Sequence, residues 1–529
     1  MPVRIPLGQS DFRQLRREGL TYIDKSLLIQ TVLDDTAHVL LLPRPRRFGK
    51  TLNLSMLRYF LEKSPEPRAA LFAGLAIASA GESYQQHFQR YPVVSLTFKD
   101  VKALSWPKCR DAMADILSAA YGEHGYLADA GILDAKEAAS FAAIHEGRAS
   151  DAELWVSLGR LCVYLARYHH ERVVLLIDEY DTPIHAGYGS GYYAEVIEFF
   201  RNFLSAGLKD NAALFKGVLT GVLRIAKDSL FTGLNNLEVY SLLRPEYSSC
   251  FGFTESEVQD LLTQAERQAH LPEVQRWYNG YLFGGQVIYN PWSVLSFVKH
   301  AEPLCQPYWV ETSSNDLVRQ QLIERGLGFT DLFERLLHGQ PIDVAVSESV
   351  ALRDLEDQPD LLWSLLLFTG YLKVVSKRIE SRKLRCELAI PNDEVLSIYE
   401  DLFSDWISQG LGGSQQRDQF LRALLGGDAD LCERLLRRWM LSSASFYDTA
   451  SLDPPERFYH GFVLGLLVSL HSRYEVLSNR ESGYGRCDVM IVPRSPGQPG
   501  VVLELKVRDD ERGETSANRN MVASTTRRI

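Results

Sequence analysis

Residues 172–179 read Arg-Val-Val-Leu-Leu-Ile-Asp-Glu, an apolar run that ends in two carboxylates. Aliphatic and β-branched residues without polar alternation predict a strand that is buried on both faces. Similar runs lie elsewhere in the first 300 residues, separated by stretches with helical spacing: His38–Leu42, Tyr91–Phe98 and Ala212–Val222. This alternation predicts an α/β domain over residues 1–300, with a parallel sheet and helices on both of its faces.

The run His38–Leu42 leads into a loop with Gly49-Lys50-Thr51, and Leu52–Leu61 after it has apolar residues at helical spacing. A strand, a tight loop and a helix start form a P-loop, because N–H groups at the helix start point at phosphate. In such a loop Lys50 reaches the β- and γ-phosphates and the Thr51 hydroxyl binds Mg²⁺. The tripeptide alone is weak evidence, since chance gives it in roughly a quarter of chains this long. The strand and the helix on either side strengthen it.

Asp178 and Glu179 supply a second motif. An apolar strand that ends in Asp-Glu has the Walker B pattern, in which Asp178 holds Mg²⁺ through water and Glu179 orients and deprotonates the attacking water. Either motif alone has an ordinary structural explanation, but the two in one α/β domain favour an ATPase site. The residues expected to bind ATP are Arg46, Arg47, Phe48, Gly49, Lys50, Thr51 and Asp178, with Thr51 and Asp178 as Mg²⁺ ligands.

Three arginines in the loop leave questions open. Arg44 stands where the consensus has its first glycine, and an arginine there cannot freely adopt positive φ, so we expect a modified loop geometry. Arg46 and Arg47 either contact phosphate or pair with acidic residues such as Asp178 or Asp181.

A polar cluster follows the fourth predicted strand and contains Thr220, Arg224 and Lys227. An arginine after this strand can sense the γ-phosphate, within one subunit or across an interface. A solvated helix start explains the same residues equally well. Arg224 is therefore a candidate catalytic residue with an open alternative.

The C-terminal region predicts a small α/β unit that begins near residue 453. A helix over Phe458–Arg473 is followed by strands at Tyr474–Leu477, Cys487–Val492 and Val501–Val507. Between the two α/β units, residues 301–452 are mainly helical by pattern, notably Leu361–Val375 and Gln416–Met440. The polar segment 508–529 has few apolar residues and is predicted to be a disordered tail.

Asp488, Glu504 and Lys506 form a candidate second site. Glu504 and Lys506 point to one face of their strand because side chains alternate, and Asp488 on the neighbouring strand can join them. Two carboxylates, Asp488 and Glu504, can bind Mg²⁺, while the lysine positions or activates water for phosphodiester attack. Glu-x-Lys is also common on exposed strands, so spacing alone leaves a structural role open.

Taken in order, the motifs resemble those of a bacterial and archaeal family of AAA-ATPase-like proteins with a C-terminal domain of the PD-(D/E)XK nuclease superfamily. The resemblance implies an AAA-like P-loop domain, an N-terminal segment around Asp24-Lys25 packed near the nucleotide, and a restriction-endonuclease-like end with Asp488, Glu504 and Lys506 in its site. An arginine at the position of Arg44 is usual in that family. The matching segments are Tyr22–Ser26, Arg44–Thr51, Ile177–Asp181, Gly233–Leu237, Trp277–Tyr281, Tyr289–Ser293 and Gly483–Asp488.

The chain departs from that superfamily at its C-terminal end. The fold normally continues after Glu-x-Lys with a helix and a further strand, but Arg508–Ile529 offers no apolar stripe for either. We therefore expect an incomplete, truncated domain over residues 453–507, with an uncovered face or edge. Its nuclease activity is accordingly in doubt.

Bulk properties limit the choice of partners. Lys and Arg number 57 against 67 Asp and Glu, and the net charge of -10 gives no global attraction to nucleic acid or anionic membrane. The longest apolar stretches, near Leu361–Thr369 and Phe462–Leu470, fall short of the ~20 residues that a membrane helix needs. The 7 cysteines lack a Cys-x-x-Cys pair, which favours a reducing cytoplasm.

The sequence thus predicts a cytoplasmic, prokaryotic protein that binds ATP and Mg²⁺, hydrolyses ATP, and couples the cycle to a nuclease-like domain acting on DNA. The alternative is a nucleotide-dependent switch or scaffold that binds a protein or nucleic-acid partner without cleavage. A homo-oligomer is left open.

Overall fold

By their internal contacts, the residues of the computed structural model form two compact units, Met1–Val318 with Pro341–Glu394, and Arg319–Gln340 with Val395–Ile529. The first unit thus includes residues 341–394, which the sequence placed in the middle region. The structure describes residues 3–224, 231, 234, 236–300, 302, 304–309, 318, 320–322, 329–349, 352–401, 414–435, 467, 470, 473–482, 485–495 and 497–503.

Five parallel strands form the centre of the first unit: β1 (Val39–Pro43), β2 (Val93–Thr97), β3 (Val173–Asp178), β4 (Leu214–Gly221) and β5 (Leu237–Val239). Their order is β2-β3-β4-β1-β5. Every residue of β1 and β3 is buried, as their continuous apolar runs require. Since parallel strands share one carboxyl edge, this order brings the residues after β1, β3 and β4 together.

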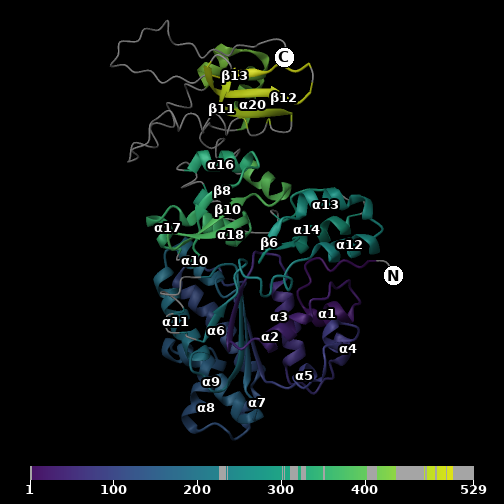
Figure 1. Cartoon of the computed structure of the whole chain (residues 1–529). Coiled ribbons are helices and arrows are strands. Elements are labelled where there is room, and N and C mark those ends of the chain that lie inside the picture. The colour runs from purple at the N-terminus through teal and green to yellow at the C-terminus, as the bar shows by residue number, and fades with distance from the viewer. Residues whose placement is uncertain are drawn as a thin grey trace. The chain divides into compact units, whose positions relative to one another are not determined.

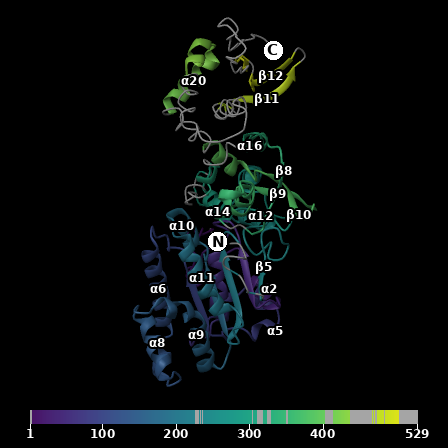
Figure 2. The ribbon, with the colours of Figure 1, turned by 90° about the vertical axis from the view of Figure 1, so that its left-hand side faces the viewer.

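Helices cover both faces of this sheet, which confirms the predicted α/β class (Figure 1). On one side α9 (Asp151–His169) and α11 (Tyr193–Leu208) pack together (Figures 1 and 2), while α3 (Lys50–Leu61) lies on the other (Figure 1). A Cβ at Gly159 would lie 2.3 Å from Ala206 O, so the close approach of α9 and α11 requires glycine. The remaining helices of this region are α1 (Phe12–Arg17), α2 (Leu27–Asp34), α4 (Ala69–Phe72), α5 (Glu82–Gln85), α6 (Trp106–Glu123), α7 (Tyr126–Asp129), α8 (Ala135–His145) and α10 (Thr182–Ser190).

A group of short helices and strands completes the first unit. Helices α12 (Glu255–Gln264), α13 (Leu271–Tyr278) and α14 (Pro291–Lys299) share one apolar core. The other elements are the hairpin β6 (Tyr281–Phe283) and β7 (Gln286–Ile288), the helices α17 (Asp354–Asp357) and α18 (Leu361–Thr369), and the antiparallel sheet β8 (Ile342–Ala345), β10 (Lys383–Ala389) and β9 (Lys373–Glu380).

That antiparallel sheet lies within residues 301–452, which the sequence predicted as mainly helical. The helix predicted over Leu361–Val375 ends at Thr369, because Gly370 takes a left-handed φ of 93° and the chain then enters β9. Leu362 to Phe368 are all buried, so the run carries no polar face that would have marked the end of the helix.

The second unit contains α16 (Thr330–Leu337), α20 (Ser414–Gly426) and the antiparallel sheet β11 (Tyr474–Ser482), β12 (Gly485–Pro493) and β13 (Val501–Leu503). The helix predicted over Gln416–Met440 is interrupted after Gly426, because Gly427 has a φ of 78°. The residues packed in one core are Phe420, Leu424, Val489, Ile491, Val501 and Leu503. Side chains of α20 therefore share an apolar core with side chains of the small sheet. Most of the predicted helix Phe458–Arg473 and all of the predicted tail lie outside the described residues.

Candidate functional site

The loop from Arg44 to Gly49, called the 44–49 loop below, joins β1 to α3. Gly49 caps α3 with a left-handed φ of 84°, and Arg47 is also left-handed at 70°. Arg44 keeps a negative φ. The left-handed residues of the loop are therefore Arg47 and Gly49, while Arg44 avoids the positive φ that an arginine does not freely adopt.

Arg44 supports the loop from inside the protein. Its side chain is fully buried, and Nη1 donates hydrogen bonds of 2.7 Å to Pro43 O and Tyr240 O. The guanidinium also lies 5.1 Å from the ring centre of Phe251. Burial lowers the pKa of Arg44 to about 10, so the group is still charged at neutral pH. A glycine would provide none of these contacts.

Lys50 begins α3 and turns its ammonium group back into the 44–49 loop. Nζ lies 3.2 Å from the carbonyl oxygens of Arg44 and Pro45, and 3.3 Å from Glu179 Oε1. Only 4% of Lys50 is exposed. The amine thus lies within 3.3 Å of three oxygen atoms, two from the loop and one from Glu179.

The carboxylate of Asp178, the last residue of β3, accepts hydrogen bonds from two hydroxyl groups. Thr51 Oγ1 donates to Oδ2 and Thr220 Oγ1 donates to Oδ1, both at 2.7 Å. Burial, followed by the charge of Glu179, raises the pKa of Asp178 above its ordinary value. The three residues come from α3, β3 and β4, so the strand order of the sheet builds this contact.

Glu179 leaves β3 in a left-handed conformation with a φ of 52°. Such strain in a residue other than glycine is typical of functional positions. Burial alone raises the pKa of its carboxyl, but Lys50 Nζ and then the Arg46 guanidinium outweigh burial, so the pKa lies below its ordinary value. Glu179 is therefore an ionised carboxylate at neutral pH.

Asp181 holds the ends of β3 and β4 together. Its Oδ2 accepts hydrogen bonds of 2.8 Å from the backbone N–H groups of Val222 and Leu223, and Tyr180 Oη donates to Leu223 O at 2.6 Å. This contact fixes the chain just before Arg224, which is half-buried. Residues 225–230, including Lys227, lie outside the described residues, and the sensor role of Arg224 stays a prediction.

Arg46 and Arg47 differ in their surroundings. Arg46 is close enough to Glu179 to lower the pKa of that carboxyl. The Arg47 guanidinium lies 4.2 Å from the ring centre of Trp292, on α14. Desolvation, and then the charge of Arg46, lower the pKa of Arg47. The loop is thereby connected to the helices that follow the sheet.

A cavity of about 470 Å³ opens above the 44–49 loop. This volume is within the range of pockets that bind small molecules. The residues that line it include Phe48 to Asn53 and Glu179, together with Trp292 and Leu295 of α14. No helix in the described part of the chain is long and apolar enough to cross a membrane.

The N-terminal segment lines the same cavity through Pro6 to Ser10 and Thr21 to Ile23, together with Lys25. Lys25 Nζ forms an ion pair of 2.6 Å with Glu257 Oε2 and donates to Ser249 O at 2.9 Å. The Asp24 carboxylate accepts from Ala76 N at 2.7 Å. Asp24 and Lys25 thus fasten the segment beside the cavity, and its position near a bound nucleotide stays a prediction.

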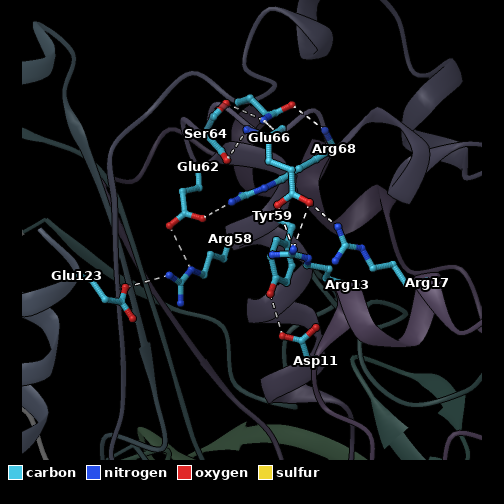
Figure 3. A network of polar contacts seen from close by, with 11 residues as sticks. Asp11, Arg13, Arg17, Arg58, Tyr59, Glu62, Ser64, Glu66, Arg68 and Glu123 are labelled. Atoms are coloured by element: carbon cyan, nitrogen blue, oxygen red, sulfur yellow. Dashed lines mark hydrogen bonds and ion pairs between the residues drawn. The ribbon is translucent and has the colours of Figure 1, made fainter.

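A polar network ties α1 to the helix that begins at the 44–49 loop (Figure 3). Tyr59 Oη on α3 donates to Asp11 Oδ2 at 2.9 Å. Arg13 and Arg17 on α1 both pair with Glu66, just beyond α3. These contacts hold the N-terminal wall of the cavity against α3.

The second predicted site is described only in part. Asp488 lies on β12, and β12 pairs with β13 up to Val489↔Leu503. Glu504 follows Leu503 directly in the sequence, but Glu504 and Lys506 lie outside the described residues. Their convergence with Asp488 therefore stays a prediction.

Comparisons with known families agree with this architecture. Residues 6–231 match the model of the predicted AAA-ATPase family described as AAA-ATPase-like, and residues 454–526 match the PD-(D/E)XK nuclease superfamily. The chain carries an AAA-ATPase-like domain and a PD-(D/E)XK-superfamily domain. The second match runs past Val507, where the sequence pattern had ended the nuclease-like domain.

Two individual proteins are similar to this chain. An Azotobacter chroococcum mcd 1 protein, described as an uncharacterized protein in the vnfD 5' region, is 26% identical over 499 residues, covering 92% of this chain and 87% of that protein. The solved structure of the Walker-type ATPase PABY2304 of Pyrococcus abyssi is 14% identical and has a TM-score of 0.34, with 75% of this chain and 98% of that one covered.

Several residues around the cavity of the AAA-ATPase-like domain were not singled out as site residues from the sequence. Lys99 and Lys102 follow β2 and line the cavity, as do Gln9 and Trp292. The two lysines carry a readable signal, because they follow a predicted strand at the same edge as Asp178. The positions of Gln9 and Trp292 depend on long-range packing, which periodicity does not report.

Proposed function

We propose that the AAA-ATPase-like domain binds ATP with Mg²⁺ and hydrolyses it. The observation that carries this proposal is the convergence of Lys50, Thr51 and Glu179 in the lining of one cavity, with Asp178 bonded to Thr51 behind them. A phosphate-binding amine, a hydroxyl–carboxylate pair and an ionised carboxylate together are what triphosphate hydrolysis requires.

The oxygen atoms present fit Mg²⁺. Thr51 Oγ1 and Asp178 Oδ2 lie 2.7 Å apart, which offers a hydroxyl and a carboxylate side by side. Mg²⁺ usually keeps several waters and substrate phosphates among its ligands, so one hydroxyl and one carboxylate are enough protein ligands. Bound there, Mg²⁺ would neutralise phosphate charge.

Glu179 is the proposed general base. It accepts a proton from water as the water oxygen forms a bond to the γ-phosphorus, and the bond from that phosphorus to the bridging oxygen breaks, leaving its electron pair on ADP. Arg46, beside Glu179, is proposed to contact phosphate, and Arg224 is proposed to sense the terminal phosphate. Lys50 holds the β- and γ-phosphates during this step.

An ATPase assay on the wild type, Lys50→Ala and Glu179→Gln tests the proposal. Lys108→Ala, which changes an exposed residue of α6, is the control. We expect Lys50→Ala to lose ATP binding and Glu179→Gln to bind ATP but lose turnover. Equal activity in all four proteins would refute the site.

We further propose that the ATPase cycle of this cytoplasmic protein governs the PD-(D/E)XK-superfamily domain, which acts on DNA through Asp488, Glu504 and Lys506 with Mg²⁺. The superfamily match and Asp488 on β12 support this part. Cleavage of DNA by the full chain with Mg²⁺ or Mn²⁺ is the test, with Asp488→Ala and Lys506→Ala as inactive variants. DNA or protein binding that changes between ATP and ADP without cleavage would instead identify a nucleotide-dependent switch.

A further inference from the structure

Strand β2 ends beside Asp178, the last residue of β3, which Glu179 follows directly. In the parallel register Thr97 lies opposite Asp178, and Phe98 N donates to Asp178 O at 3.0 Å. Lys99, the next residue, therefore leaves the sheet at the edge where Glu179 leaves β3.

The turn after β2 is held by buried side chains and local hydrogen bonds. Phe98 and Val101 are 1% and 2% exposed, and the Phe98 ring packs 5.1 Å from that of Phe200. Val101 N donates to Phe98 O and Lys102 N donates to Asp100 O, both at 3.0 Å. This anchoring fixes the backbone positions from which the exposed Lys99 and Lys102 line the cavity.

Lys99 and Lys102 differ in their ion pairing from two other lysines that line the cavity. Lys50 has Glu179 as its carboxylate partner, and Lys25 has Glu257. Within the described part of the chain, no ion pair involves Lys99 or Lys102. The lining of the cavity consequently includes two exposed ammonium groups that suit an additional anion.

We propose that Lys99 and Lys102 bind the terminal phosphate of a nucleoside triphosphate. This inference rests on the proposed ATPase function and adds the groups that recognise the phosphate being removed. Charge on that phosphoryl group shifts during transfer, and cations fixed around it stabilise the transition state. The turn after β2 thus distinguishes ATP from ADP within a single chain.

Binding and turnover in Lys99→Gln, Lys102→Gln and the double variant test the proposal. ATP and ADP affinities are measured by calorimetry with Mg²⁺, with ATP titrated into proteins that also carry Glu179→Gln to prevent turnover. The control is Lys108→Gln, which removes the same charge from the exposed surface of α6. Lys99→Arg with Lys102→Arg tests rescue by a retained charge.

We expect the double glutamine variant to bind ATP about tenfold more weakly and to lose at least about tenfold in kcat, with ADP affinity unchanged. The arginine pair should recover most of both losses. ATP affinity and kcat equal to those of Lys108→Gln, or equal weakening of ATP and ADP, would overturn the inference while leaving the ATPase proposal intact. A wild-type protein that neither binds nor hydrolyses ATP would overturn both.

Discussion

Lys50 Nζ lies 3.3 Å from Glu179 Oε1, so the amine proposed to hold phosphate and the carboxylate proposed to activate water contact each other directly. Lys50 has three N–H donors, and the carbonyls of Arg44 and Pro45 lie within reach of the same group. A phosphate oxygen at this position competes with Glu179 for those donors. In the proposed mechanism, nucleotide binding would therefore be linked to the ionic partner of the general base through one side chain.

This contact predicts a pH dependence of stability. Because the pKa of Glu179 is lowered in the folded protein, its contribution is complete above the unfolded value of about 4.5 and is lost as pH falls through the folded pKa. We expect the difference in Tm between the wild type and Glu179→Gln to be largest near neutral pH and to shrink below about pH 4.5. Thermal unfolding from pH 3.5 to 8 measures it. Glu198→Gln, exposed on α11, is the control, and a difference that does not change with pH would contradict the argument.

We expect loss of the Thr220 hydroxyl to lower the free energy of unfolding, because this hydroxyl donates to Oδ1 of the Asp178 carboxylate. Thr220→Val keeps the shape of the side chain but leaves buried Oδ1 without its hydroxyl donor, which should cost about 1–3 kcal/mol. The pKa of Asp178 should rise further, and Mg²⁺-ATP should bind more weakly. Urea unfolding checks the first outcome. Thr263→Val on α12, whose hydroxyl donates to Gln259 O at an exposed site, should stay within about 0.5 kcal/mol of the wild type.

The strands that build this site could be predicted because they are buried on both faces. Continuous apolar runs located β1 to β4, and Asp178 with Glu179 followed from the end of one run. The short β5 was not predicted, since two half-buried residues on either side of an exposed Glu238 form no such run. The antiparallel sheet of β8, β9 and β10 was not predicted either. Most of β9 is exposed, and its polar residues resemble those of a loop or a helix surface.

Other features depend on contacts between distant residues. Arg44 was predicted to alter the loop, but nothing local indicated that Tyr240 and Phe251 would surround its side chain. Arg47 was predicted to meet phosphate or a carboxylate, and its stacking on Trp292 involves a residue 245 positions away in the chain. Periodicity reports which face of an element is buried and leaves the partner on that face unspecified.

We expect a side chain added at Gly221 to clash with its neighbours where β3 and β4 end. A Cβ there would lie 2.5 Å from Asp181 Oδ1 and 2.8 Å from Tyr180 Cε1, so Gly221→Ala must displace the carboxylate that holds Val222 and Leu223. We expect a loss of about 1–3 kcal/mol in the free energy of unfolding and reduced ATPase activity.

Gly189→Ala is the matched control for Gly221→Ala. Gly189 lies in α10, where an added Cβ would meet no neighbouring atom within 4 Å, and the variant should gain about 0.5–1 kcal/mol from the better helix propensity of alanine. Similar unfolding free energies for the two variants would show that the junction is more adaptable than its packing indicates.

Because of Glu394, we expect the stability of the protein to fall as the pH rises above about 4.5. Its carboxyl is fully buried, accepts hydrogen bonds from Ser293 Oγ at 2.8 Å and Trp309 N at 2.9 Å, and burial raises its pKa to about 8. The folded protein therefore keeps a proton that the unfolded chain releases above about pH 4.5. Stability should fall between that pH and about 8, with a slope of at most about 1.4 kcal/mol per pH unit from this group.

Glu394→Gln removes that dependence while keeping an oxygen to accept both hydrogen bonds. We expect its Tm to match that of the wild type near pH 5 and to exceed it at pH 8 to 9. At the higher pH the wild type must either keep its buried carboxyl protonated, although the unfolded chain releases that proton, or bury a negative charge. The glutamine variant requires neither. Thermal unfolding of both proteins across this range, with Glu198→Gln as the exposed control, measures the difference. Parallel curves for the wild type and Glu394→Gln would mean that Glu394 titrates as an ordinary carboxyl and that water reaches it in the folded protein.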